Sequence, residues 1–267
     1  MENAIINIEN AVVSYRENVA LRGVSLKVKA GEFIGVIGPN GAGKTTLLTI
    51  INGLGKLVSG TVTVLGKRVN GSGRHELRKQ VGYIAQVEII DPRMPISVRE
   101  AVMLGRYGLL GLFHGPQKHD WVIVDETLEM VGMTQLAYRP IGHLSGGEQQ
   151  RVSIARCLAQ EPKIFLLDEP TASLDWKAQT EILEIVKRIH DERHLTTLFV
   201  THDLDALPHA CDRVVLMKDG LIIGDGTPDD LITTDSLSRL YNLPATVVEE
   251  RHPHIHPSPE GFTRRST

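Results

Sequence analysis

The spacing of apolar residues changes twice along this chain. In the first third, short apolar runs with polar breaks predict strands at 4–15, 20–32, 33–38 and 59–69. A helix is predicted at 44–53, directly after the most compact apolar run. From about 95 to 160 the spacing becomes that of amphipathic helices, separated by loops rich in Gly and Pro.

A regular exchange of strands and helices returns after residue 160. Strands are predicted at 163–169, 196–202 and 212–226, with a long helix at 176–193 between the first two. In that helix, one buried stripe is formed by residues spaced three and four apart: Ile182, Ile185, Val186 and Ile189. Buried strands that alternate with helices predict an α/β fold with a mainly parallel central sheet, an antiparallel β layer and a helical insertion.

These patterns divide the chain into one domain and a tail. We expect a single domain over 1–245, with the core and β layer at about 1–90 and 160–230 and a helical subdomain at about 91–159. Residues 246–267 become polar and rich in Pro and His, which predicts a flexible tail.

Composition narrows the classes of function. The 267 residues are 42% hydrophobic, enough for one substantial core or two small ones. A formal net charge of −3 gives no indication of a nucleic-acid partner. The apolar runs are far shorter than the roughly 18 residues of a membrane span, and we expect no signal peptide. Two cysteines make no disulfide framework, which favours a cytosolic protein with reduced thiols.

The segment "GPNGAGKT" at 38–45 fits the pattern G-x-x-x-x-G-K-[ST] of phosphate-binding loops. A buried strand enters it and an apolar-periodic helix leaves it, as that loop requires. Its glycines let backbone N–H groups face a phosphate, the lysine reaches the β- and γ-phosphates, and the Thr45 hydroxyl ligates Mg²⁺. The predicted nucleotide-binding residues are Gly38, Pro39, Asn40, Gly41, Ala42, Gly43, Lys44, Thr45 and Thr46.

Two acidic residues end the apolar strand "KIFLLDEP". Asp168 is expected to hold the magnesium ion, directly or through water. Glu169 is expected to orient or deprotonate the attacking water. A strand that ends in two acids is also common as a solvated terminus, but together with the phosphate loop it favours hydrolysis of a nucleoside triphosphate.

The segment "LSGGEQQ" at 144–150 precedes another apolar-periodic stretch. Ser145 and Glu148 have the spacing of a capping box. The first two helical positions would then be Gly146 and Gly147, each of which costs about 0.5–1 kcal/mol relative to alanine. Either these are ordinary loop glycines beside a cap, or an anion approaches a helix N-terminus that has no side chains in the way.

The phosphate loop, "LSGGEQQ", "LLDEPTASLD" and "FVTHD", in this order, closely resemble the nucleotide-binding subunits of ABC transporters. The resemblance covers residues 1 to about 245 and implies a P-loop NTPase fold of the ABC type. It also implies a homodimer or another paired ATPase subunit, in which Ser145, Gly146, Gly147 and Glu148 cap the ATP held by the other copy. The implied cofactors are ATP and Mg²⁺.

Further site residues follow from the same resemblance. Tyr15 matches the aromatic residue that stacks on adenine, and Gln86 matches the glutamine that contacts metal and water. Asp175 matches a turn that contacts the opposite subunit. His202 matches the histidine that binds the γ-phosphate.

The resemblance also implies partners: integral membrane permease subunits and a substrate-binding protein, with this chain on the cytoplasmic face of the membrane. The segment "PISVREAVMLGRYGLLGLF" is similar to that of ATPases that power bacterial import of metal cations, chiefly manganese, zinc or iron. Importers of iron-siderophores or cobalamin share a related pattern and stay an alternative. A soluble ABC ATPase acting on ribosomes or DNA, or a small-molecule kinase, fits less of the sequence.

Three histidines alternate in the tail segment "HPHIHP": His252, His254 and His256. Neutral imidazoles are good ligands for Zn²⁺ and similar ions. The segment is therefore either a weak metal site or a solvated end of the chain.

Overall fold

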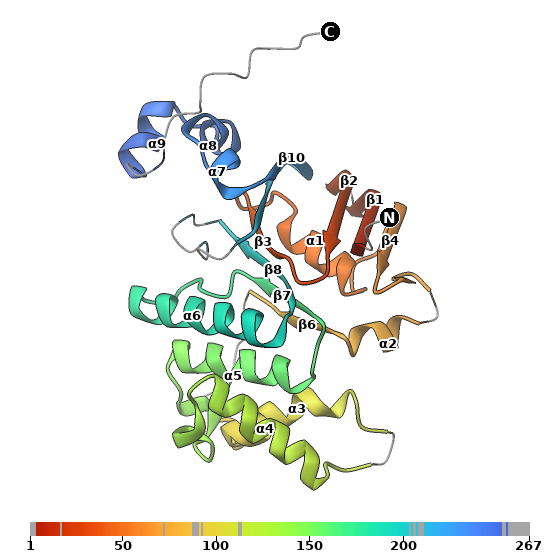
Figure 1. Ribbon diagram of the computed structural model, residues 1–267, viewed down its shortest axis with the longest axis vertical. Coiled ribbons are helices and arrows are strands. Elements are labelled where there is room, and N and C mark those ends of the chain that lie inside the picture. Colours follow the sequence, from red (N-terminus) through yellow and green to blue (C-terminus); the bar gives the residue numbers. More distant parts are fainter. Residues whose placement is uncertain are drawn as a thin grey trace.

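The computed structural model describes residues 4–16, 18–71, 73–86, 91, 93–111, 114–202, 204, 207, 211–252 and 255. It contains two sheets and a group of helices (Figure 1). The central sheet has six strands in the order β10-β9-β3-β8-β7-β6. In chain order its strands are β3 (Phe33–Ile37), β6 (Val81–Ile84), β7 (Ile164–Asp168), β8 (Thr196–Thr201), β9 (Arg213–Lys218) and β10 (Leu221–Gly226).

All neighbouring strands of this sheet are parallel except β10, which runs antiparallel to β9. Every residue of β3, β7 and β8 is buried, as expected for strands covered on both faces. The predicted α/β fold with a mainly parallel sheet is thus confirmed. Parallel strands also place their carboxyl ends along one edge of the sheet, where ligands of such folds bind.

An antiparallel sheet forms the N-terminal layer, in the order β2-β1-β4-β5. Its strands are β1 (Ala4–Tyr15), β2 (Asn18–Lys29), β4 (Ser59–Val64) and β5 (Lys67–Arg68). One core cluster joins its inward side chains to helix α1 (Lys44–Ile51) and to residues of β3, β7 and β8. Helix α1, which follows the phosphate loop, is therefore held between the two sheets.

The helices of the middle segment pack against each other and against the opposite face of the central sheet. They are α3 (Val98–Tyr107), α4 (Lys118–Met130), the 3₁₀ turns η1 (Thr134–Leu136) and η2 (Ile141–His143), and α5 (Gly146–Ala159), with α6 (Trp176–Arg193) beside them. Figure 1 shows α3, α4 and α5 gathered at one end of the molecule's long axis. The short helix α2 (Arg74–Arg78) precedes β6.

Three short helices at the other end of the long axis were not predicted from the sequence: α7 (Pro228–Leu231), α8 (Thr234–Tyr241) and α9 (Ala245–Arg251). Thr227 and Thr233 cap the first two by accepting backbone N–H groups. Helix α9 occupies the start of the segment 246–267 that we expected to be a tail, and its Val248 is buried. The rest of that expected tail lies outside the described residues, apart from His252 and Ile255.

Candidate active site

The carboxyl edge of the central sheet brings together the residues that the sequence singled out. The phosphate loop 38–45 follows β3, His202 follows β8, Asp168 ends β7 and Glu169 is the next residue. Gln86 lies just beyond β6. Because β3, β8, β7 and β6 are neighbours in this order, segments far apart in the sequence meet at one edge.

The phosphate loop is packed too tightly for side chains at two of its glycines. A Cβ on Gly38 would lie 2.2 Å from the carbonyl oxygen of Met217. Gly43 has φ +100°, and a Cβ there would lie 2.7 Å from the Ala20 carbonyl oxygen. Helix α1 then begins at Lys44 without a side-chain cap and without an acidic residue in its first turn. Its N-terminal N–H groups are thus suited to an anion.

Lys44 is buried inside this loop. Its Nζ donates to the carbonyl oxygens of Gly38 at 2.7 Å and Pro39 at 3.2 Å, and it lies 3.4 Å from Glu169 Oε1. Burial lowers the pKa of Lys44, and the charge of Glu169 opposes that shift. The ammonium group therefore lies between the loop that would take a phosphate and the carboxylate that would act on water.

Glu169 contacts the other two predicted catalytic residues, Gln86 and His202. Its Oε2 accepts a hydrogen bond from Gln86 Nε2 at 2.8 Å and lies 3.0 Å from His202 Nδ1. The backbone of Glu169 has φ +50°, a conformation that is uncommon for a residue with a side chain. Its N–H donates to the Val200 carbonyl at 3.0 Å, so β8 holds this turn in place.

Asp168 is also buried, and burial is the main cause of its raised pKa. Its Oδ2 accepts a hydrogen bond from the Tyr83 hydroxyl at 3.2 Å, and the nearby Thr45 side chain acts on the same carboxylate to lower its pKa. Among the described residues, Asp168 Oδ1 has no hydrogen-bond partner. A buried carboxylate oxygen left over beside a threonine hydroxyl fits a hard cation such as Mg²⁺.

Tyr83 is a site residue that the sequence did not single out. It lies in β6, three residues before Gln86, where an aromatic side chain is equally typical of an ordinary strand position. Burial, followed by the charge of Asp168, raises the pKa of Tyr83, so its hydroxyl stays protonated and donates to Asp168.

The predicted capping box at the start of α5 is confirmed. Ser145 Oγ accepts from the Glu148 N–H, and Glu148 Oε2 accepts from the Ser145 N–H at 2.7 Å. The two glycines that follow differ. A Cβ on Gly147 would lie 3.1 Å from Ala178 Cβ, a tight contact. A Cβ on the exposed Gly146 would make only an ordinary 3.5 Å contact with Leu174.

A separate cavity of about 420 Å³ collects the start of α5 and the turn before α6. Ser145, Gly146, Gly147, Glu148 and Asp175 all line it, and no residue of the phosphate loop does. Asp175 caps α6 by accepting the Ala178 N–H at 2.8 Å. Within one chain, then, this group of residues and the Lys44 site line different surfaces.

The remaining predicted residues are less constrained. Tyr15 ends β1 with its side chain half exposed. Trp176, the residue after Asp175 in the sequence, is 84% exposed. His252 follows α9, whereas His254 and His256 lie outside the described residues. In the part of the chain that the structure describes, no group of three or more His, Cys, Asp or Glu side chains is arranged to hold a metal ion.

No helix in the described ranges is both long and apolar enough to cross a bilayer. A family model described as "ABC transporter" matches residues 21–172. The chain is 38% identical, over 90% of its length and 92% of the relative's, to the manganese transport system ATP-binding protein MntB of Halalkalibacterium halodurans. It is 36% identical to the chelated iron transport system membrane protein YfeB of Yersinia pestis, over 88% of this chain and 78% of that one.

The fold has a solved counterpart as well. An inward-facing conformation of a putative metal-chelate type ABC transporter superposes with a TM-score of 0.79 and 27% identity, covering 91% of this chain and 90% of that one. The sequence matches and the arrangement of the phosphate loop, Asp168 and Glu169 lead to one conclusion. The chain belongs to the ABC transporter family as an ATP-binding subunit, which hydrolyses ATP to drive transport.

Proposed function

We propose that this subunit works as a pair on the cytoplasmic face of a membrane and energises import of a divalent metal cation, manganese or iron. Separate permease subunits and a substrate-binding protein would complete the system. Relatives named for manganese and for chelated iron transport, each more than 35% identical, support this substrate class. Zinc stays within the same proposal, since the sequence segment that suggested metal import does not separate these ions.

The observation that carries the catalytic part is the set of contacts around Glu169. Lys44 and the N-terminus of α1 bind the phosphates, while Thr45 and Asp168 hold Mg²⁺, which when bound neutralises phosphate charge. Glu169 accepts a proton from the attacking water, and Gln86 and His202 orient Glu169 through the 2.8 Å and 3.0 Å contacts. A positioned base of this kind is worth about 10²–10⁴-fold in rate.

The test of this site uses Glu169→Gln and Lys44→Ala. Glu169→Gln should bind ATP, turn it over slowly, and accumulate as an ATP-bound pair that elutes as a dimer in size-exclusion chromatography. Lys44→Ala should lose affinity for ATP itself. Normal turnover by Glu169→Gln would contradict the role of Glu169 as the base. Unchanged ATP binding by Lys44→Ala would contradict the role of Lys44 in phosphate binding.

Pairing is supported by Gly146. Its own chain leaves space for a side chain there, so packing within the subunit does not require glycine. The exposed N-terminus of α5 is instead free to approach a phosphate held by another copy. This accounts for the first of the two glycines at the start of α5, while the second, Gly147, packs closely against Ala178.

We assign permease docking to the surface of α3. Two cavities, of about 360 and 550 Å³, share Gly108, and Leu104 and Tyr107 beside them are each about half exposed. Tyr83 lines the smaller cavity and also donates to Asp168, so a partner seated there would contact a neighbour of the magnesium site. Leu104→Glu should abolish co-purification with the permease. The matched control Val122→Glu, at a half-exposed position on α4, should not.

The substrate itself is tested with the assembled transporter. Stimulation of ATPase activity by binding protein loaded with Mn²⁺, Fe²⁺ or Zn²⁺ would identify the ion. An importer of chelated iron or cobalamin is the alternative to an importer of free metal cations. It is supported by the similarity to the structure named as a metal-chelate type ABC transporter. Stimulation by a metal chelate and not by free cations would select that alternative.

A further inference from the structure

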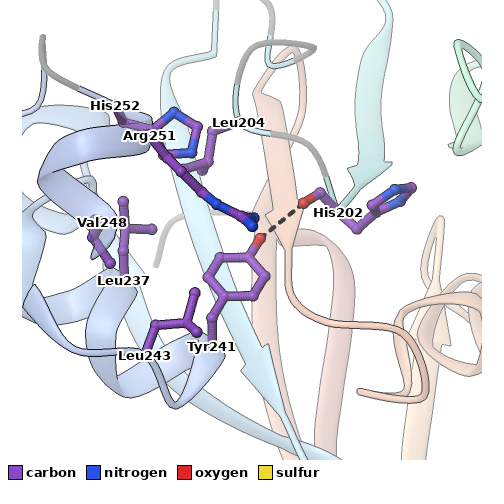
Figure 2. Close-up of a pocket in the computed structure, with 8 residues that line it drawn as sticks. All are labelled: His202, Leu204, Leu237, Tyr241, Leu243, Val248, Arg251 and His252. Atoms are coloured by element: carbon purple, nitrogen blue, oxygen red, sulfur yellow. Dashed lines mark hydrogen bonds between the residues drawn. The ribbon is translucent and has the colours of Figure 1, made fainter. Parts of the chain in front are cut away.

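Helix α8 contacts the active-site histidine through a hydrogen bond of Tyr241. The Tyr241 hydroxyl donates to the backbone carbonyl oxygen of His202 at 2.9 Å. Figure 2 shows the hydroxyl directed at this carbonyl, while the imidazole of His202 points away from Tyr241. The bond therefore acts on the backbone of His202 and leaves its ring free to contact Glu169, 3.0 Å from Nδ1.

Helix α8 is firmly attached to the central sheet. Its Leu237 and Leu240 are buried in a core cluster with Val214 and Leu216 of β9. At the end of the helix, Lys218 of β9 donates to the Asn242 side chain at 2.5 Å and contacts the Arg239 carbonyl. Tyr241 is thus presented from an element that is fixed to β9, two strands away from β8 in the sheet.

His202 is less well held by packing. It is the first residue after β8, and its side chain is 47% exposed. A cavity of about 410 Å³ lies next to it, lined by Tyr241 and by apolar side chains that include Leu237, Leu243 and Val248 (Figure 2). Because this space leaves the Tyr241 ring and His202 room to shift, packing alone does not fix their relative position.

We propose that Tyr241 is a positioning residue for ATP hydrolysis: its hydrogen bond to the His202 carbonyl holds the chain at the end of β8, so that the imidazole stays against Glu169. The inference rests on the proposed role of His202 in catalysis. It gives the C-terminal helices, which lie outside the matched family region 21–172, a direct effect on the rate of turnover.

The test is Tyr241→Phe in the full-length chain, assayed for ATP hydrolysis under paired conditions. The variant keeps the ring and removes only the hydroxyl. Since a net hydrogen bond of ordinary strength corresponds to about a 2- to 12-fold change in an equilibrium, kcat should fall by about that factor. The KM for ATP should change less than twofold, because the substitution removes only the hydroxyl bonded to the His202 carbonyl and leaves the phosphate-binding residues 38–46 unchanged. Tyr138→Phe, at a tyrosine that is 81% exposed on the helical subdomain, is the matched control and should hydrolyse ATP normally.

A double-mutant cycle separates positioning from a general structural role. In a His202→Ala background, single-turnover assays with enzyme in excess over ATP measure the slow residual rate. There Tyr241→Phe should have no further effect, because the ring that it positions is gone. An equal rate loss in both backgrounds, a raised KM, or wild-type kcat would overturn the proposal. Failure of the proposed catalytic site is seen separately, as normal turnover by Glu169→Gln.

Discussion

Replacing Gly146 by alanine should change stability and activity in opposite directions. Gly146 is the first residue of α5, and a Cβ at that position meets only Leu174 Cδ2, at an ordinary 3.5 Å. Alanine in a helix is favoured over glycine by about 0.5–1 kcal/mol. For a domain of this size, that gain corresponds to a rise in Tm of about 1–4 °C. Packing within the subunit thus gives no reason to keep glycine.

We expect Gly146→Ala to lower the rate of ATP turnover. If the N–H groups at the start of α5 bind a phosphate held by the paired subunit, an added methyl group at Gly146 keeps that phosphate away. Hydrogen bonds to charged groups are worth about 1.5–3 kcal/mol, which corresponds to a loss of about 10- to 150-fold in rate. ATP binding to the isolated subunit should be unchanged, because Lys44 and its loop line a different surface.

Two measurements decide the outcome: the Tm of nucleotide-free protein by calorimetry, and kcat at protein concentrations that support pairing. Gly147→Ala is the contrasting variant, because its Cβ would lie 3.1 Å from Ala178 and it should not raise the Tm. Gly115→Ala, at an exposed loop position with no atom near the added Cβ, is the control for activity. A stabilised Gly146→Ala variant with wild-type kcat would refute the approach of a second subunit's phosphate. A destabilised one would refute the packing argument.

Two further predictions concern stability. Gly105→Ala should lower the free energy of unfolding by about 1–3 kcal/mol, measured by urea titration. The new Cβ would lie 2.0 Å from the Arg156 carbonyl oxygen and push α3 away from α5. Gly108→Ala is the control: its Cβ would meet no atom within 4 Å, so the free energy of unfolding should change little. Burial lowers the pKa of His190, whose Nδ1 lies 3.0 Å from Thr197 Oγ1, so the unfolded chain takes up a proton before the folded one does. Its contribution to stability is therefore complete above the ordinary histidine pKa of about 6.5 and is lost as the pH falls from that value through the lower pKa of the folded state. His190→Gln should flatten the dependence of Tm on pH between 7 and 5, and an unchanged slope would contradict this assignment.

The sequence predicted the parts of the fold that depend on local pattern. The buried run 33–38, the phosphate loop and the helix after it are adjacent in sequence, so spacing alone defines the site of Lys44. The apolar stripe of 176–193 likewise predicted α6 correctly. The short helices α7, α8 and α9 were missed, because four to eight residues hold too few turns for a clear helical period.

The contacts within the site were beyond the reach of local pattern. Glu169, Gln86 and His202 come from three separate strand ends, and only the strand order brings polar atoms of Gln86 and His202 to within 3.0 Å of the Glu169 carboxylate. Tyr83 could not be distinguished from an ordinary strand tyrosine, and Tyr241 lies in a helix that the sequence did not predict. The roles assigned to these residues stay predictions, and the proposed variants of Glu169 and Tyr241 test two of them.

The ion pair between Lys44 and Glu169 has a consequence for the nucleotide-free state of the subunit. As long as no nucleotide is present, the same ammonium group that would grip a phosphate neutralises the carboxylate that would activate water. An arriving phosphate competes for that ammonium and thereby releases the carboxylate. Binding of ATP and release of the Glu169 carboxylate would then occur together. In the absence of nucleotide, the catalytic base would stay paired with Lys44.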